Sequence, residues 1–186
     1  ISALSEIDGI EWIRVLYCYP DRITDGLINE FKNNDKLLKY IDMPIQHIND
    51  DVLKRMNRRD TSESIKETVK KLRDEVPGIV IRSTVIVGFP GETEKQFNEL
   101  RAFLKETKFE RLGAFEYSRE EGTPAYDMPK QVSANTKKKR LDAVMSDQNR
   151  IHNDFNEGFV GKTIRVICEG YDPVSECFYG RSYADA

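Results

Sequence analysis

Cysteine and histidine are scarce in this sequence, and long apolar runs are absent. Its 186 residues include three cysteines and two histidines, and these do not form a close cluster along the chain. Their scarcity argues against a disulfide framework and against a zinc or iron–sulfur site made wholly by this chain. Because no run of about 18 apolar residues occurs, we expect no membrane span. The odd number of cysteines, with no export signal in view, favours a reducing cytoplasm.

The charges of the chain nearly balance. There are 29 basic and 32 acidic residues, which gives a net charge of −3. This balance excludes a globally basic nucleic-acid clamp but not a local basic patch. The length suits one globular domain with a small appendage. The chain starts without a methionine and ends just past a strand-like stretch, so we expect a fragment of a longer protein.

Strand-like and helix-like segments alternate over the first 157 residues. Strands are predicted at 12–20, 40–44, 77–91 and 111–118, and helices at 24–34, 50–56, 61–76, 93–107 and 135–157. This order predicts an α/β fold with a parallel sheet, either open or closed into a barrel. Functional groups should then collect beyond the carboxyl ends of the strands. The candidates there are Cys18, Tyr19, Gln46, His47 and the segments 88–92 and 116–119.

The pattern changes at Gly158. Residues 163–170 and 177–183 alternate like two antiparallel strands, with a turn at 171–175 between them. We therefore expect two parts: residues 1–157 as the α/β part, and residues 158–186 as the start of a second domain.

Several glycine-rich, acidic and basic candidates leave different chemistries open. The segment "VIVGFPGET" (85–93) lacks the Lys-Ser/Thr of a P-loop, so a tight turn into a helix is favoured over a phosphate site. Asp42 and Glu116 could form the carboxylate pair of a hydrolase. Arg58 and Arg59 could be surface charges, or could bind a carboxylate or phosphate bidentately.

Histidines and lysines add further alternatives. His47 could be a base or ligand, although a hydrogen-bonded structural residue is more common at such a place. His152 falls on the apolar face of the last helix and is predicted to pack there. The run "KKKR" (137–140) is predicted to be a solvated helix start, with RNA contact as the alternative.

Four segments, taken in order, carry a family resemblance. "DMPIQH", "VLKRMNRR", "VIVGFPGET" and "EYSREEGTPA" resemble the radical S-adenosylmethionine methylthiotransferases. The likeness runs from about Trp12 to the end. It is strongest to the RimO type, which methylthiolates an aspartate of small-subunit ribosomal protein twelve, and weaker to the MiaB type, which modifies transfer-RNA. A barrel hydrolase and a non-enzymatic RNA- or ribosome-binding module are the alternatives from other classes.

The resemblance implies a fold and a set of cofactors. The fold is a partial (β/α)₆ barrel of the radical SAM type, of which about four β/α units are present, followed near Phe159 by a TRAM domain that could contact RNA. The cofactors are S-adenosylmethionine and two [4Fe–4S] clusters, one of them held by a CxxxCxxC loop. This sequence has no CxxxCxxC. We therefore expect the cluster ligands to precede Ile1, and this chain alone to be inactive, with no catalytic or metal-binding residue of its own.

The resemblance also implies roles for individual residues. Gln46 would hydrogen-bond the ribose or methionyl end of S-adenosylmethionine, and Arg58 would pair with its carboxylate. Val87 and Gly88 would lie against the adenine, and Thr84 stands where related enzymes often carry an acid. The residues predicted to face the substrate are His47, Tyr117, Ser118 and Arg119.

Overall fold

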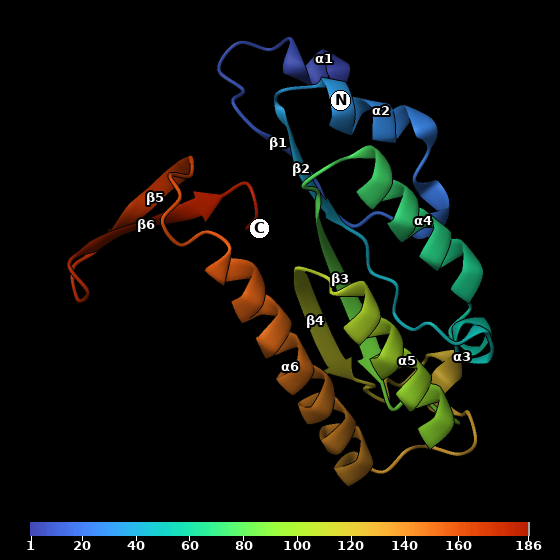
Figure 1. Ribbon diagram of the computed structural model, residues 1–186. Coiled ribbons are helices and arrows are strands. Elements are labelled where there is room, and N and C mark those ends of the chain that lie inside the picture. The colour runs from blue at the N-terminus through green and yellow to red at the C-terminus, as the bar shows by residue number, and fades with distance from the viewer. Residues whose placement is uncertain (186) are drawn as a thin grey trace.

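The computed structural model describes residues 1–185 and contains two sheets (Figure 1). The larger sheet has four parallel strands in the order β1-β2-β3-β4. They are β1 (Ile13–Val15), β2 (Leu37–Asp42), β3 (Val80–Val87) and β4 (Arg111–Glu116). The smaller sheet pairs β5 (Val166–Asp172) with β6 (Cys177–Ser182) in antiparallel fashion. The expected α/β fold, with a parallel sheet followed by a small antiparallel one, is confirmed.

Helices connect the parallel strands and cover one face of their sheet. The connecting helices are α2 (Asp25–Asn33), α4 (Ser62–Glu75) and α5 (Glu94–Thr107), and the long α6 (Ala134–Glu157) runs beside β4 (Figure 1). Shorter elements are α1 (Ser2–Ser5), α3 (Asp50–Arg55) and the 3₁₀ turns η1 (Pro20–Arg22) and η2 (Pro124–Tyr126). No helix within residues 1–185 is both long enough and apolar enough to cross a membrane.

Side-chain caps fix where the connecting helices begin. The Thr93 hydroxyl accepts from the Gln96 backbone N–H at 3.3 Å, and Gln96 Oε1 accepts from the Thr93 N–H at 3.0 Å. This capping box, predicted from the sequence, satisfies two donors that would otherwise lack partners. Thr24 caps α2 as predicted, by accepting from the Leu27 N–H.

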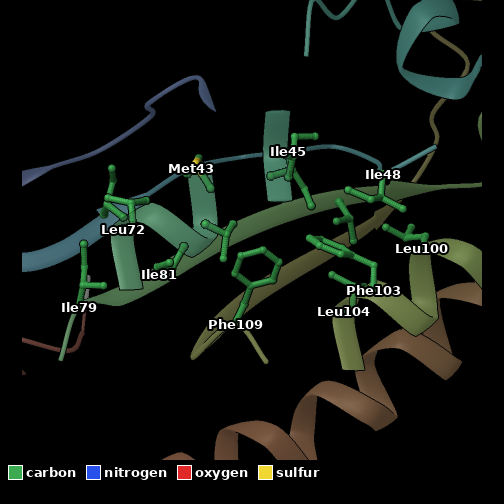
Figure 2. Packing of buried hydrophobic residues seen from close by; sticks show 14 of the residues in the cluster. Met43, Ile45, Ile48, Leu72, Ile79, Ile81, Leu100, Phe103, Leu104 and Phe109 are labelled. Carbon is green, nitrogen blue, oxygen red and sulfur yellow. The ribbon is translucent and has the colours of Figure 1, made fainter. Parts of the chain in front are cut away.

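The core lies between the sheet and its covering helices. Ile81, Val85 and Val87 alternate along β3 toward the helices and are fully buried. Figure 2 shows Phe103 and Leu104 of α5 close to Phe109 in the same layer. The opposite face of the sheet carries the residues between them, such as Arg82, Thr84 and Ile86.

The first two strands differ from their predicted limits. The structure keeps only Ile13–Val15 of the predicted strand 12–20, because the pairing register with β2 shifts within β1 and Tyr17 has a positive φ of 58°. β2 starts three residues earlier than predicted and ends at Asp42, before Pro44. Two hydrogen bonds to Asp42 keep the chain beside β2 after β1 has ended: the Cys18 N–H donates to its carbonyl at 2.8 Å, and the Tyr17 N–H donates to its carboxylate at 3.2 Å.

Candidate functional site

A cavity of about 1130 Å³ opens at the carboxyl ends of the parallel strands. Each strand contributes to it through the loop that follows, as expected for a parallel sheet. Its wall includes Tyr19 after β1, Gln46 after β2, residues 55–60 around the end of α3, Ile86 and Phe89 at the end of β3, residues 115–118 at the end of β4, and Met128.

Gln46 is held at this cavity by the backbone of β3. Its N–H donates to the Thr84 carbonyl, and its own carbonyl accepts from the Ile86 N–H, both at 2.9 Å. Gln46 has a positive φ of 67°, a conformation that is strained for residues other than glycine. Its side-chain Oε1 is buried and has no hydrogen-bond partner in the described part of the chain, residues 1–185. The sheet therefore fixes a free amide oxygen in the cavity wall.

Arg58 is also fixed, but its charge is already compensated. Its Nη2 donates to the Pro44 carbonyl at 2.8 Å and lies 3.3 Å from Asp60 Oδ2. The guanidinium stands over the ring of Tyr19, with its carbon 4.5 Å from the ring centroid. The buried Nε has no partner among residues 1–185. Arg58 is thus a rigid part of the wall whose Nε remains available to a ligand.

Tyr117 adds a third free polar group. Its hydroxyl is buried and finds no hydrogen-bond partner among the residues that the structure describes, and its ring packs edge-on against Phe89 with centroids 5.1 Å apart. The Tyr117 N–H donates to the Val87 carbonyl at 2.9 Å. Lys137 Nζ donates to the Tyr117 carbonyl at 2.7 Å. The hydrogen bonds at the N–H and at the carbonyl of Tyr117 fix its backbone, and the packing against Phe89 fixes its ring. Together they position the hydroxyl.

The remaining residues at the end of β4 differ in position. Ser118 lines the cavity, and its hydroxyl donates to the exposed Glu120 carboxylate. Arg119 is not among the lining residues, because its Nε donates to the Tyr126 carbonyl at 2.7 Å and its guanidinium stacks on the Tyr126 ring. Arg119 is exposed beside the opening.

His47 does not face the opening, and this part of the prediction is wrong. The residue is fully buried, its Nδ1 accepts from the Asn49 N–H at 2.9 Å, and its Nε2 lies 3.4 Å from Glu92 Oε1. Since Nδ1 accepts, Nε2 carries the proton and donates to Glu92. His47 is therefore a structural residue behind the cavity.

Glu92 is the centre of this buried group. Its carboxylate accepts from His47, from the Gly88 N–H and from Arg140 Nη1, the last at 3.0 Å. Arg140 was predicted to be solvated with the rest of 137–140, and this is wrong because α6 turns its side chain inward to Glu92. The group joins the loop after β2, the loop after β3 and α6.

Thr84, Val87 and Gly88 do not line the cavity but hold residues that do. The Thr84 carbonyl binds Gln46, and the Val87 carbonyl binds Tyr117. Gly88 adopts a positive φ of 74°, and a β-carbon there would overlap with Cγ of Lys137. Their contribution to the site therefore comes from their backbone groups.

The proposed carboxylate pair of a hydrolase is not assembled. Glu116 lines the cavity, whereas Asp42 does not and is only 2% exposed. One oxygen of Asp42 accepts from the Tyr17 N–H at 3.2 Å, and the other lies 3.8 Å from Arg82 Nε. Asp42 is thus a structural residue that contacts the segment after β1 and the neighbouring strand β3.

Cys18 lies outside the cavity, with its thiol partly buried. Burial, and next the nearby Asp42 carboxylate, raise the pKa of this thiol above its ordinary value. Within residues 1–185, no group of three or more histidine, cysteine, aspartate or glutamate side chains is placed so that it could hold a metal ion.

The sequence did not single out several residues of the cavity. Arg55, Phe115 and Met128 were not candidates, yet all line it. Arg55 stands in the same segment, "VLKRMNRR", that drew attention to Arg58, and lies one helical turn earlier. Phe115 is 60% exposed, which is unusual for a phenylalanine and was not visible in the strand pattern.

Curated proteins match the whole length of this chain. RimO, the ribosomal protein uS12 methylthiotransferase of Thermoanaerobacter sp., is 49% identical over 186 residues, which are 100% of this chain and 42% of that protein. The protein of the same name from Geobacter sulfurreducens is 51% identical over 187 residues, with the same coverage of 100% and 42%. This chain thus spans about two fifths of the length of these curated relatives.

A solved structure supports the fold independently of close sequence identity. Coproporphyrinogen III oxidase (HemN) from Escherichia coli, described as a Radical SAM enzyme, superposes with a TM-score of 0.61 at 18% identity, over 75% of this chain and 32% of that one. The Radical SAM superfamily profile matches residues 1–104, which are more than half of the chain. The chain belongs to the radical SAM superfamily.

Proposed function

We propose that this chain is part of a methylthiotransferase that inserts a methylthio group at the β-carbon of an aspartate of ribosomal protein uS12. The observation that carries the proposal is the identity of 49% and 51% to two proteins of that name, over the whole of this chain. The alternative, a transfer-RNA enzyme of MiaB type, is separated from this proposal by the experiment below.

The free polar groups of the cavity suit S-adenosylmethionine. That molecule offers ribose hydroxyls, an ammonium, a carboxylate and an adenine, and a cavity wall with unpaired donors and acceptors can satisfy them. Gln46 Oε1 would accept from a ribose hydroxyl or the ammonium, and Arg58 Nε would donate to the methionyl end. Thr84, Val87 and Gly88 would support this site through the backbone contacts described above.

Iron–sulfur clusters are part of the same proposal. When bound at a [4Fe–4S] cluster, S-adenosylmethionine supplies a carbon radical that removes hydrogen from an unactivated carbon. We place the ligands of both expected clusters elsewhere in the longer protein, since this sequence has no CxxxCxxC. The chain's own residues then bind and orient the nucleoside part.

The roles of the residues that face the substrate, and of the second domain, are proposed from where these residues lie. Tyr117, Ser118 and Arg119 stand at the end of β4 beside the opening, where a cation would attract an aspartate-bearing loop. Residues 158–186 would begin a TRAM domain that contacts RNA of the ribosome. A ribosomal substrate also implies action in the cytoplasm.

Mass spectrometry of both candidate substrates tests the function. The full-length protein, reconstituted with iron and sulfide without oxygen, is incubated with S-adenosylmethionine, a reductant and a sulfur source. One reaction contains ribosomal protein uS12 and the other transfer-RNA. We expect one methylthio group on an aspartate of uS12 and none on the transfer-RNA. Modification of transfer-RNA alone would contradict the proposal.

A further inference from the structure

Arg55, the last residue of α3, places its guanidinium in the wall of the cavity. It lies against the backbone at Gly91, where a β-carbon would stand 3.7 Å from Arg55 Nε and 3.8 Å from its Cζ. Gly91 has a positive φ of 78°, so the turn after β3 presents bare backbone to the guanidinium. The side chain is therefore confined between the end of α3 and that turn.

The charge of Arg55 is not compensated within the described residues. Its Nε and Nη2 are buried without a hydrogen-bond partner, and no carboxylate of residues 1–185 lies within 4.0 Å of its nitrogens. By contrast, Arg58 has Asp60, and Arg140 has Glu92. Burying two donors of a half-buried cation without a partner is costly, and an anion that enters the cavity would satisfy both.

The surroundings of Arg55 strengthen attraction for an anion. Val52, Phe89 and Tyr117 form a small apolar cluster beside it, and polar attraction is stronger next to such surfaces than in water. Three acids line the same cavity: Asp60 is occupied by Arg58 and by the Asp21 N–H, and the carboxylates of Asp21 and Glu116 lie more than 4.0 Å from the nitrogens of Arg55. The unpartnered Tyr117 hydroxyl lines the same cavity and can donate to the same ligand.

We propose that Arg55 binds a carboxylate in this cavity, through the planar pair of donors that its Nε and Nη2 offer. The inference rests on the proposed function, which brings two carboxylates to the cavity: that of the methionyl group and that of the substrate aspartate. Both share the chemistry that Arg55 recognises, and binding measurements separate them.

The test measures equilibrium binding to the reconstituted full-length protein by calorimetry. The variants are Arg55→Gln and, as the matched control, Lys54→Gln, which removes the same charge from the neighbouring, exposed position of α3. The ligands are S-adenosylmethionine, its decarboxylated analogue, and a uS12 loop peptide with either the aspartate or an asparagine in its place. We expect Arg55→Gln to lower the affinity for one of the carboxylate ligands about tenfold or more. The affinity for the counterpart of that ligand without the carboxylate should change by less than about twofold.

The ligand that loses affinity identifies the source of the carboxylate. Loss with S-adenosylmethionine but not with its analogue assigns the methionyl group, and loss with the aspartate peptide but not the asparagine peptide assigns the substrate. Arg55→Lys, which keeps the charge without the fork, should recover part of the affinity. We also expect Arg55→Gln to melt no lower than the unsubstituted protein, because it removes an unpaired charge.

Two outcomes would overturn the assignment of Arg55, and a third would contradict the proposed function. If Arg55→Gln and Lys54→Gln bind all four ligands alike, the assignment of Arg55 is overturned. If Arg55→Gln lowers the melting temperature strongly and Arg55→Lys shows no preferential loss for a carboxylate ligand, Arg55 is a structural residue. Failure of the unsubstituted protein to bind S-adenosylmethionine or the peptide would contradict the proposed function itself.

Discussion

Arg140 of α6 donates to Glu92 at 3.0 Å in a place where the side chain of the arginine is 7% exposed and that of the glutamate 0%. The same Arg140 nitrogen donates to the Glu92 backbone carbonyl at 3.2 Å. Through Glu92, the arginine is linked to His47 and to the Gly88 N–H. This one pair therefore connects α6 to the two loops that shape the cavity.

Breaking the pair from either side should destabilise the protein strongly. Glu92→Ala leaves the buried Arg140 with only the exposed Glu94 carboxylate, 3.2 Å from its Nη2, and Arg140→Ala leaves the buried Glu92 without a cationic partner. We expect each change to lower the free energy of unfolding by about 3 kcal/mol. The double variant should lose much less than the sum of the two single losses, because neither charge is then left alone. Urea unfolding followed by circular dichroism measures this coupling. Additive losses would show that the two charges do not depend on each other.

Gly88→Ala should lower the free energy of unfolding by more than the strain of a positive φ alone would. The new β-carbon would overlap with the Lys137 side chain, in addition to the strain of a φ of 74°. Gly122→Ala is the matched control, since Gly122 has a φ of 80° and nothing within 4 Å of the added carbon. We expect about 1 kcal/mol for Gly122→Ala and about 2–4 kcal/mol for Gly88→Ala from urea unfolding. Equal losses would exclude the contact with Lys137 as a cause.

The sequence predicted the elements well because their causes are local. Ile65, Val69, Leu72 and Val76 recur at helical spacing, and all four are buried in the structure. The capping box of Thr93 and Gln96 depends on residues three positions apart. The parallel sheet followed from the alternation of such elements along the chain.

What the sequence did not predict depends on contacts between distant residues. Arg140 stands in a run of four cations, and nothing local distinguishes it from its neighbours. Its burial follows from Glu92, which lies 48 residues away. The place of Arg55 in the cavity likewise depends on the turn at Gly91, which the chain reaches only after α4 and β3. Gln46 was a candidate because it follows a predicted strand, and the family resemblance added the roles of Gln46 and Arg58 toward S-adenosylmethionine.

Asp147 of α6 should make the stability depend on acidity. Burial opposes ionisation of its carboxylate, but hydrogen bonds from Arg101, Lys105 and Arg150 outweigh it and hold the pKa of Asp147 below its ordinary value. A carboxylate with a lowered folded-state pKa stabilises the fold above its unfolded-state pKa of about 4, and this contribution disappears as the pH falls through the folded-state pKa.

Asp147→Asn isolates this contribution. The variant should be less stable than the unsubstituted protein at pH 7, and the difference should shrink as the pH falls below about 4. Asp142→Asn serves as the control, because Asp142 is exposed on the same helix and lies 3.7 Å from Lys138. Thermal unfolding across this pH range gives the comparison. A constant difference between the Asp147→Asn and unsubstituted proteins would contradict the pairing of Asp147.

Cys18 should react more slowly than the two other cysteines. Its thiol is partly buried and its pKa is raised, so less thiolate is present at pH 7.5, whereas Cys168 and Cys177 are exposed. Alkylation with iodoacetamide, followed by peptide mass spectrometry, gives the three rates. Asp42→Asn should speed the reaction at Cys18, since the carboxylate is the second cause of the raised pKa. Faster labelling of Cys18 than of the other two in the folded, unsubstituted protein would contradict its placement.

Gln46→Gly should separate stability from ligand binding. The substitution relieves the strained φ of 67° and removes the unpartnered Oε1, while the backbone bonds to Thr84 and Ile86 remain available. We therefore expect stability that is unchanged or raised by up to about 1 kcal/mol, since relief of strain is offset by the freedom of glycine in the unfolded chain.

Under the proposed function, the same variant should bind S-adenosylmethionine about tenfold more weakly, because the bound ribose or ammonium loses its acceptor. Gln46→Glu keeps an oxygen at the same reach and should retain more affinity than Gln46→Gly. Calorimetry on the reconstituted full-length protein measures binding, and urea unfolding measures stability. If Gln46→Gly lowered stability while leaving affinity intact, the strained conformation of Gln46 would serve the fold and not the ligand.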